Sequence, residues 1–276
     1  MGPDPATALF TIDGGDGEIV TATELSRGPW DPRACHGGPV SALLIRSVEQ
    51  VAAADAGASI RWEVARSTVE LVRPVPVLVP MHVTAEVERP GRNVSLVASV
   101  LRTVEGTEVA RARTLRIRRA ELAVDPAHAR ETTFSAVGAG NATGSSWPAR
   151  DYTSFHPDAV ELRFVSGAFD ERGPAQVWCR LRVPIVDGEE PSGAQRAMAA
   201  CDFGNGIAGE LDPDVVTFLN PDLTVHFARP PEGEWIGLDA RSHYGPFGSG
   251  FAESAVFDQA GRLGRAVQSL LLAPRG

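Results

Sequence analysis

Asp202 is an acidic residue in an apolar stretch, with Ala197-Met198-Ala199-Ala200-Cys201 before it and Phe203 after it. Burial among such neighbours raises the pKa of a carboxyl group unless hydrogen bonds or a cation offset it. A carboxylate in this setting can take or direct the proton of a water molecule, which is the basic requirement of a hydrolytic reaction. Because Gly204 and Asn205 follow, a plain helix end at Asp202 is the alternative interpretation.

Gln268 is a second candidate for this chemistry. It lies between Val267 and Ser269 in a run that continues as Leu270-Leu271-Leu272, which is typical of a buried strand. A buried amide must find hydrogen-bond partners, and it can hold a water molecule without being charged. Gln268 is therefore a candidate for holding a water molecule.

His36-Gly37-Gly38 precede Pro39, a residue that suits the first turn of a helix. Free backbone N–H groups and the positive end of the helix dipole can face a carbonyl oxygen there, and glycine lets a ligand approach closely. The alternative is a tight helix entrance in which His36 makes only a structural hydrogen bond.

The elements that position these residues follow the same order in both halves of the chain, namely a helix and then several strands. Apolar periodicity from Pro39 predicts a helix of about four turns that stops before Gly57, and a second, short helix is predicted at 194–203. Alternating polarity between Pro and Gly breaks predicts strands at 67–72, 82–88, 94–102, 108–116, 160–165, 177–183, 222–229, 235–241, 250–257 and 262–272.

An internal repeat relates the two halves. Thr68-Val69 with Arg73-Pro74 recurs as Thr224-Val225 with Arg229-Pro230 at a constant offset of 156 residues. The predicted domains are therefore 1–120 and 151–276, joined by a linker at 121–150 that is rich in Ala, Gly, Ser and Thr. Further along the offset is 154, because two residues are missing from a turn, so Thr114 stands where Gln268 would be in the first half. The position of Asp202 falls near Ile45, which predicts one active site per chain.

Composition excludes several classes of function. A net charge of −9 disfavours binding to nucleic acid or to an anionic membrane, and no apolar run is long enough to span one. Three scattered cysteines without a Cys-x-x-Cys pair predict neither a disulfide framework nor a metal site, and no motif predicts a cofactor. Because Gly-x-Ser-x-Gly is absent, a serine nucleophile is not supported. The N-terminus lacks the pattern of a signal peptide, so we expect a cytoplasmic protein.

A long helix followed by a curved antiparallel sheet that wraps it is the hotdog arrangement, so two copies predict an α+β double hotdog. The segments that support a family are Trp30-Asp31-Pro32, His36-Gly37-Gly38-Pro39, Arg73-Pro74-Val75-Pro76, Ala200-Cys201-Asp202-Phe203, Leu219-Asn220-Pro221-Asp222-Leu223, Phe227-Ala228-Arg229-Pro230 and Arg265-Ala266-Val267-Gln268. Their order along the chain resembles the acyl-CoA thioesterase II family and its actinobacterial relatives.

The resemblance implies hydrolysis of an acyl-CoA, or another acyl thioester, within fatty acid metabolism. Asp202 and Gln268 would hold the attacking water, and Asn220 would assist at a position where the family usually has a hydroxyl residue. Asn220-Pro221 is also a turn signal, which leaves a pure loop role open.

For substrate binding we expect His36, Gly37 and Gly38 at the helix start, together with Phe247 and Gly248 in a glycine-rich stretch. An aromatic residue in such a stretch is better placed against an acyl ligand or a partner chain than against water. The resemblance also implies self-association, at least as a homodimer.

Two other functions stay open at this stage. Asp31 and His36 have the Asp-x4-His spacing that resembles the acid and base pair of hotdog enoyl-CoA hydratases, although the glycine and Asn-Pro of that motif are missing. A non-catalytic acyl-thioester-binding protein is the second alternative, because hotdog folds also have scaffolding and regulatory roles.

Overall fold

The computed structural model describes residues 6–13, 19–51, 61–123, 134–139, 141–142 and 151–275 of the chain. The elements of the first half are β1 (Phe10–Asp13), β2 (Ile19–Ala22), α1 (Gly37–Gln50), β3 (Trp62–Leu71), β4 (Pro80–Arg89), β5 (Val94–Thr103) and β6 (Glu108–Arg118). The later elements are β7 (Asn141–Ala142), β8 (Val160–Ser166), β9 (Ala175–Leu181), α2 (Gly193–Cys201), α3 (Gly204–Ile207), β10 (Val216–Leu219), β11 (Asp222–Phe227), β12 (Trp235–Tyr244), β13 (Ser249–Asp258) and β14 (Gly261–Pro274).

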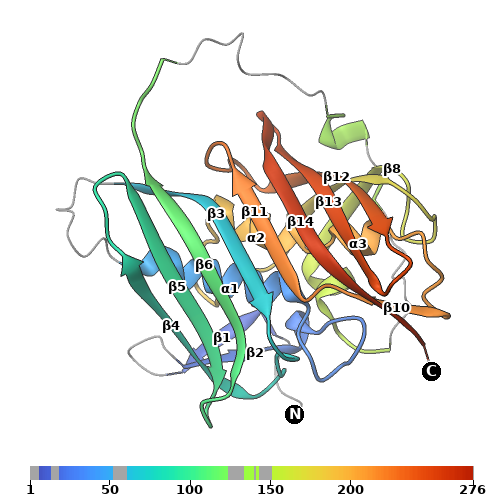
Figure 1. Cartoon of the computed structure of the whole chain (residues 1–276), viewed down its shortest axis with the longest axis horizontal. Coiled ribbons are helices and arrows are strands. Elements are labelled where there is room, and N and C mark those ends of the chain that lie inside the picture. The colour runs from blue at the N-terminus through green and yellow to red at the C-terminus, as the bar shows by residue number, and fades with distance from the viewer. Residues whose placement is uncertain are drawn as a thin grey trace.

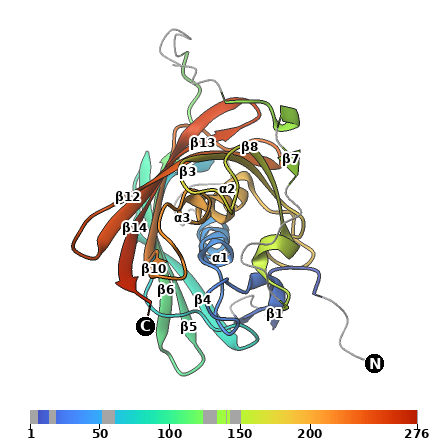
Figure 2. The ribbon, with the colours of Figure 1, turned by 90° about the vertical axis from the view of Figure 1, so that its right-hand side faces the viewer.

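All of these strands belong to one antiparallel sheet. Its order is β1-β2-β4-β5-β6-β3-β11-β14-β13-β12-β9-β8-β7, and β10 pairs with β14 off this path. The sheet runs across the whole molecule (Figure 1) and curls around the helices, so that α1, α2 and α3 lie on its concave side (Figure 2). This arrangement is a double hotdog and confirms the predicted fold class.

The two halves join where β3 pairs with β11. Thr68 and Thr224, which occupy the same place in the two repeats, lie directly opposite each other in this ladder. The Thr224 hydroxyl donates to Oγ1 of Thr68 over 3.1 Å. The approximate twofold axis that relates the halves therefore passes through this pair of threonines.

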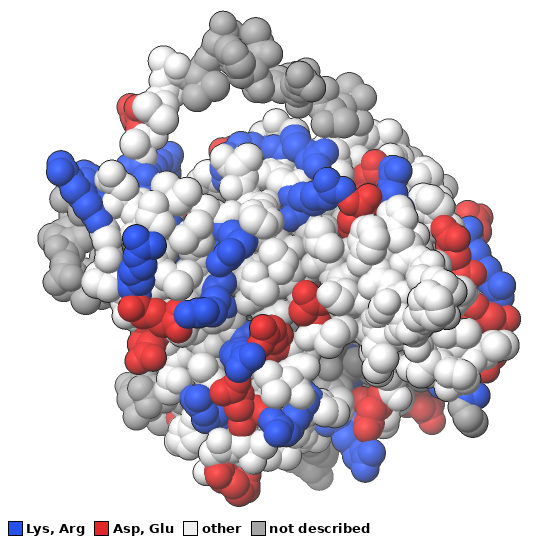
Figure 3. Space-filling model, in the orientation of Figure 1, with Lys and Arg blue, Asp and Glu red and all other residues white. Residues whose placement is uncertain are grey.

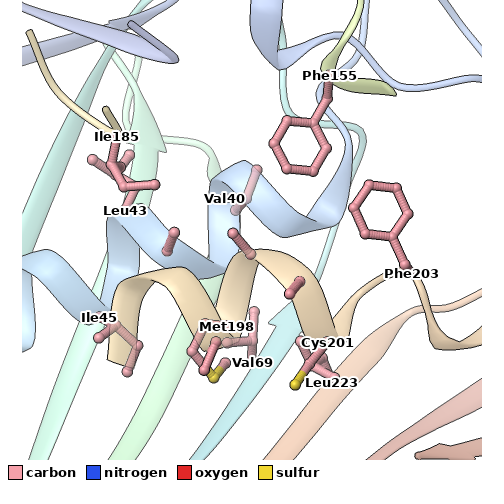
Figure 4. Packing of buried hydrophobic residues seen from close by; sticks show 14 of the residues in the cluster. Val40, Leu43, Ile45, Val69, Phe155, Ile185, Met198, Cys201, Phe203 and Leu223 are labelled. Atoms are coloured by element: carbon pink, nitrogen blue, oxygen red, sulfur yellow. The ribbon is translucent and has the colours of Figure 1, made fainter. Parts of the chain in front are cut away.

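The helices meet at close range inside the sheet (Figure 4). A Cβ added to Gly38 of α1 would lie 2.5 Å from the carbonyl oxygen of Ala199 in α2, so only glycine permits this approach. The two helices and the strands around them share one hydrophobic core that includes Val69 of β3 and Leu223 of β11. Burial of this core from both halves holds the amino end of α1 against the carboxyl end of α2.

The N-terminal strands β1 and β2 were not predicted. Phe10 in β1 is fully buried, and its backbone bridges to Val186 of the second half. The N–H of Leu9 donates to the carbonyl of Pro184 (3.1 Å) and that of Phe10 to Ile185 (2.9 Å). Leu9 and Phe10 are thus held by backbone groups of the second half, a pairing that side-chain patterns do not report.

Part of the predicted linker packs on the second half. Phe134 stacks on Phe257 with ring centroids 4.5 Å apart, and the Trp178 indole N–H donates to the carbonyl of Ser135 over 2.8 Å. Strand β7 pairs with β8. The boundaries at 120 and 150 stay predictions, because residues 124–133 and 143–150 lie outside the described part.

Candidate active site

Asp202 lies where α2 ends, directly after Cys201. The predicted helix extends to Phe203, but α2 ends at Cys201 and Asp202 is its C-terminal cap with helical angles (φ −68°, ψ −17°). Asp202 therefore ends the helix, and it also lines a cavity. Only 5% of its surface is exposed.

Three side chains surround the Asp202 carboxylate. Its Oδ2 atom lies 2.6 Å from Nδ1 of His36. Its Oδ1 atom accepts from Nδ2 of Asn220 (2.7 Å) and from Nε2 of Gln268 (3.1 Å). The structure thus brings together the three residues expected to handle water, and it adds His36, which was expected only to bind substrate.

These contacts decide the charge of Asp202. Burial raises the pKa of its carboxyl group, but the charge and the hydrogen bond of His36 lower it, as do hydrogen bonds from Asn220 and the Gly38 N–H. The contacts that lower the pKa prevail over burial, so the pKa lies below the ordinary 3.8 and the carboxylate is ionised at neutral pH. The amino end of α1, with its partial positive charge, faces this anion.

Gly37 has no side chain, and this leaves space for the Asp202 carboxylate. A Cβ at this position would lie 2.8 Å from both Oδ1 and Oδ2 of Asp202. As the first residue of α1, Gly37 has an N–H without an intrahelical partner, and it lines the cavity. Gly38, one residue further on, is buried between the helices and does not line the cavity.

Gln268 is fixed from both ends of its amide. Its Nε2 donates to the Asp202 carboxylate and, over 3.2 Å, to the Asp202 carbonyl. Its Oε1 accepts from the Asn205 N–H over 3.1 Å. Strand β14 and the start of α3 therefore hold the end of α2 in one orientation.

His36 is the N-terminal cap of α1, and aromatic rings restrain its imidazole. The ring centroid lies 5.1 Å from that of Phe155 and 5.2 Å from that of Phe203. Phe155 and Phe203 face each other beside the helix ends in Figure 4. The side chain is 14% exposed and lines the cavity.

The cavity has a volume of about 410 Å³ and opens beside the start of α1. Most of its walls are apolar, and the hydrophobic side chains in them are Trp30, Val40, Leu71, Val72, Val75, Phe169, Phe203, Phe218, Leu219 and Leu271. The polar groups of His36, Asp202 and Asn220 converge at one side. An apolar cleft with a few convergent polar groups is typical of a site for a small, largely apolar ligand.

The chain matches the N-terminal domain of acyl-CoA thioesterases over residues 26–137 and their C-terminal domain over residues 128–272. It belongs to the acyl-CoA thioesterase family. The family prediction is thereby confirmed, and the protein is a thioester hydrolase by membership. No curated protein matches the chain.

Solved structures agree with this thioesterase assignment at the level of fold. A hotdog protein of unknown function from Alicyclobacillus acidocaldarius superposes with a TM-score of 0.69 at 17% identity, over 95% of each chain. A putative thioesterase from Novosphingobium aromaticivorans gives 0.68 at 19% identity, over 97% of this chain and 100% of the other. A putative thioesterase II from Thermobifida fusca gives 0.66 at 16%, over 97% and 96%.

The hydratase pair expected as an alternative does not form in this thioesterase. Asp31 accepts from the Arg33 guanidinium over 3.1 and 2.9 Å, and this hydrogen bond holds its pKa below the ordinary value. His36 is paired with Asp202 instead. Asp31 and His36 thus both line the cavity, but each is paired with another residue.

Phe247 and Gly248 are not part of the cavity. They lie in the turn between β12 and β13, and Phe247 is 94% exposed. Around β10 and the adjoining ends of β13 and β14, the face in Figure 3 is broad and uncharged, whereas arginine and acidic side chains cover the strands of the first half. The glycines of this stretch shape a hairpin at the surface rather than a ligand pocket.

Sequence reasoning missed His156. It lines the cavity, and its ring lies 4.5 Å from that of Phe169. Burial, with smaller contributions from the charges of His36 and Arg182, lowers its pKa to about 4, so it is neutral at neutral pH. Nothing near His156 in the sequence marks it, because its neighbours in space come from distant segments.

Among the described residues, no helix is long and apolar enough to cross a membrane. Within the same part of the chain, no three His, Cys, Asp or Glu side chains gather to hold a metal ion.

Proposed function

We propose that the protein hydrolyses acyl-CoA thioesters in the cavity between α1 and the end of α2. The observation that carries this proposal is the buried, ionised carboxylate of Asp202 at the amino end of α1, in the wall of an apolar cavity. The acyl chain would occupy the apolar part. The thioester carbonyl would lie at the polar side, next to Asp202, His36 and Asn220.

In the reaction, a water oxygen attacks the carbonyl carbon while its proton passes to the Asp202–His36 pair. The oxygen of the resulting tetrahedral intermediate carries a negative charge. The Gly37 N–H and the dipole of α1 would stabilise this charge, because that N–H has no intrahelical partner. When the intermediate collapses, the carbon–sulfur bond breaks and the thiolate takes up the proton, which yields a carboxylic acid and CoA.

Asn220 and Gln268 support this step through their hydrogen bonds to Oδ1 of Asp202. Neutral amides fix the carboxylate without competing with it for a proton. Asn220 also lines the cavity, so its carbonyl oxygen can accept a hydrogen bond from the attacking water.

The test is a panel of acyl-CoAs of different chain length, with released thiol measured for the wild type and for Asp202→Asn. We expect the variant to lose kcat by about 10² or more, because the amide cannot balance a charge on His36. Asp214→Asn, an exposed acid outside the cavity, is the matched control and keeps full activity. Binding of acyl-CoA without any release of thiol by the wild type would instead favour the non-catalytic binding protein.

We also propose that the chain forms a homodimer through the surface around Phe247. Strands β10, β13 and β14 adjoin there. Large exposed hydrophobic side chains lie in these strands or directly beside them, namely Val215, Phe247, Phe251 and Leu271. Light scattering would give about twice 29.3 kDa for the wild type and the monomer mass for Phe247→Ser. A monomeric wild type would contradict the proposal.

We further propose that the protein is cytoplasmic and acts in fatty acid metabolism. Cell fractionation tests the cytoplasmic location.

A further inference from the structure

Building on the proposed function, we infer that the imidazole of His36, through its Nε2 atom, takes the proton of the attacking water. Asp202 then acts as a positioning residue that orients the imidazole and balances its charge. Asn220 and Gln268 hold Asp202 in turn. The inference changes the expectation from the sequence, in which Asp202 itself is the base and His36 only contacts the substrate.

The first argument is that the carboxylate oxygens of Asp202 already have partners. Oδ1 accepts from two amide groups and Oδ2 lies 2.6 Å from His36. The Gly38 N–H adds a further hydrogen bond, and only 3% of the side chain is exposed. A carboxylate that is stabilised as an anion by so many donors is a weak base, because proton transfer to it gives up that stabilisation.

The second argument concerns the position of the proton on His36. Because the Asp202 carboxylate is ionised, a separation of 2.6 Å from Nδ1 requires a hydrogen between the two atoms. Nδ1 is therefore the donor, and the 3.2 Å contact between Nδ1 and the Gly38 N–H cannot be a true hydrogen bond in this state. In the neutral imidazole, Nε2 then carries the lone pair.

The third argument is that Nε2 is available. Among the described residues, no group forms a hydrogen bond with this atom, whereas the imidazole lines the cavity. The rings of Phe155 and Phe203 keep the imidazole from rotating away. A base that a carboxylate orients, and whose second nitrogen has no partner on a side chain that lines the cavity, has the geometry of an activated histidine.

The proton balance is complete with groups that are present. Water loses one proton to Nε2 as its oxygen bonds to the carbonyl carbon, and His36 becomes an imidazolium beside the Asp202 carboxylate. On collapse of the intermediate, the imidazolium returns that proton to the leaving sulfur. No oxidant, metal or further reactant is needed.

The pH dependence separates the two possible bases. The titratable groups that face His36 are Asp202 from the end of α2 and His156 from the segment before β8. The pKa of His156 is lowered to about 4 and that of Asp202 lies below 3.8, so at neutral pH His156 is neutral and Asp202 is ionised. If His36 is the base, kcat/KM falls when the imidazole is protonated, because a protonated imidazole has no lone pair to offer.

The decisive variant is His36→Asn, measured beside Asp202→Asn and beside His226→Asn as the control at an exposed histidine of β11. Asparagine caps a helix and keeps an N–H near Asp202, but it removes the base. We expect kcat to fall by about 10² to 10⁴ while KM changes less than about threefold and the unfolding midpoint stays near that of the wild type. The acid limb of the profile should disappear from the residual activity.

Imidazole added to His36→Ala provides a second readout that a structural role would not move. We expect it to restore part of the rate in a saturable way, and to leave Asp202→Asn unchanged. If His36→Asn keeps kcat within about tenfold of the wild type with its acid limb intact, Asp202 is the base and the inference is wrong. A wild type that cleaves no acyl-CoA would instead overturn the proposed function.

Discussion

Two junctions between the helices are related by the repeat, and only one of them has the chemistry of an active site. The offset of 156 residues that relates Thr68 to Thr224 also relates the N-terminal caps His36 and Ser192. At the first junction His36 contacts the end of α2. At the second, the Ser192 hydroxyl donates to Glu49, near the end of α1, over 2.8 Å.

The second junction has an arginine at the position that an aspartate occupies in the first junction. By the same offset, Arg46 occupies the position of Asp202, and its buried guanidinium donates to Glu189 over 2.5 Å. Thr114 takes the place of Gln268 and is hydrogen-bonded to Ser67 over 2.9 Å. Both copies therefore keep the helix caps that the fold requires, whereas the carboxylate, imidazole and amide cluster exists in one copy. The cluster that we propose as the active site therefore occurs at one of the two junctions.

Alanine at the two equivalent helix starts should affect different properties, and the effect on catalysis is the larger of the two. In Gly37→Ala the new Cβ lies 2.8 Å from both carboxylate oxygens of Asp202, which must move. In Gly193→Ala the Cβ lies 2.2 Å from the carbonyl oxygen of Pro231, so backbone must move. We expect Gly37→Ala to lose about 10² in kcat and Gly193→Ala to lose about 1–3 kcal/mol of stability.

Steady-state kinetics and urea unfolding of both variants check this contrast. Alanine favours a helix over glycine, so Gly37→Ala should remain folded and as stable as the wild type. The opposite pattern, with activity lost in Gly193→Ala and stability lost in Gly37→Ala, would break the comparison of the two junctions.

The two junctions also hold carboxylates whose pKa values shift in opposite directions. The pKa of Asp202 is lowered, because the contacts with His36, Asn220 and Gly38 prevail over burial. Glu49 is exposed on one side, and the pKa of its carboxyl group is raised above 4.5, because partial desolvation beside α2 prevails over its hydrogen bonds from Gln195 and Ser192. The folded state thus favours the charged form of one carboxyl group and the neutral form of the other.

Unfolding free energy should therefore depend on these groups with opposite sign. The folded pKa of Asp202 lies below the unfolded value, so its contribution is present above 3.8 and is lost as pH falls through the folded value. For Glu49 the contribution is present below 4.5 and is lost as pH rises through the folded value. The unfolding free energy can be measured by urea unfolding at a series of pH values. Its dependence on pH should become flatter on the acid side in Asp202→Asn, and flatter toward neutral pH in Glu49→Gln. The same slope change in both variants would contradict the assignment.

Much of the fold follows from the sequence, because its periodicity is local. The predicted strand at 94–102 is β5 at Val94–Thr103, and the helix predicted from Pro39 is α1 with its four turns. Alternation and helical spacing report which face of an element is buried, and they do so without knowledge of the partner. Phe10 is different, because backbone groups of Pro184 and Ile185 hold it in place.

The candidate site is predicted in part for a similar reason. The resemblance to the acyl-CoA thioesterase family implies that Asp202, Asn220 and Gln268 act together, and the structure brings their side chains into contact. The contact of His36 with Asp202 joins the start of one helix to the end of another, which only tertiary packing determines. Phe247 was expected to bind substrate, but it lies in an exposed hairpin outside the cavity. An aromatic residue among glycines fits such a hairpin as well as it fits a pocket.

The smallest effect concerns the axis that relates the two junctions. The Thr224 hydroxyl donates to Oγ1 of Thr68 over 3.1 Å, at the centre of the β3–β11 pairing. Valine keeps the shape and strand preference of threonine, so Thr224→Val removes little besides this hydrogen bond. We expect a loss of about 0.5–1.5 kcal/mol in urea unfolding and no change in kcat, because the pair lies outside the cavity walls.

The double variant Thr68→Val with Thr224→Val should cost no more than either single variant, since each single variant already removes the hydrogen bond. Additive losses would mean that each hydroxyl stabilises the fold through other contacts, and that the axis pair does not help to join the halves.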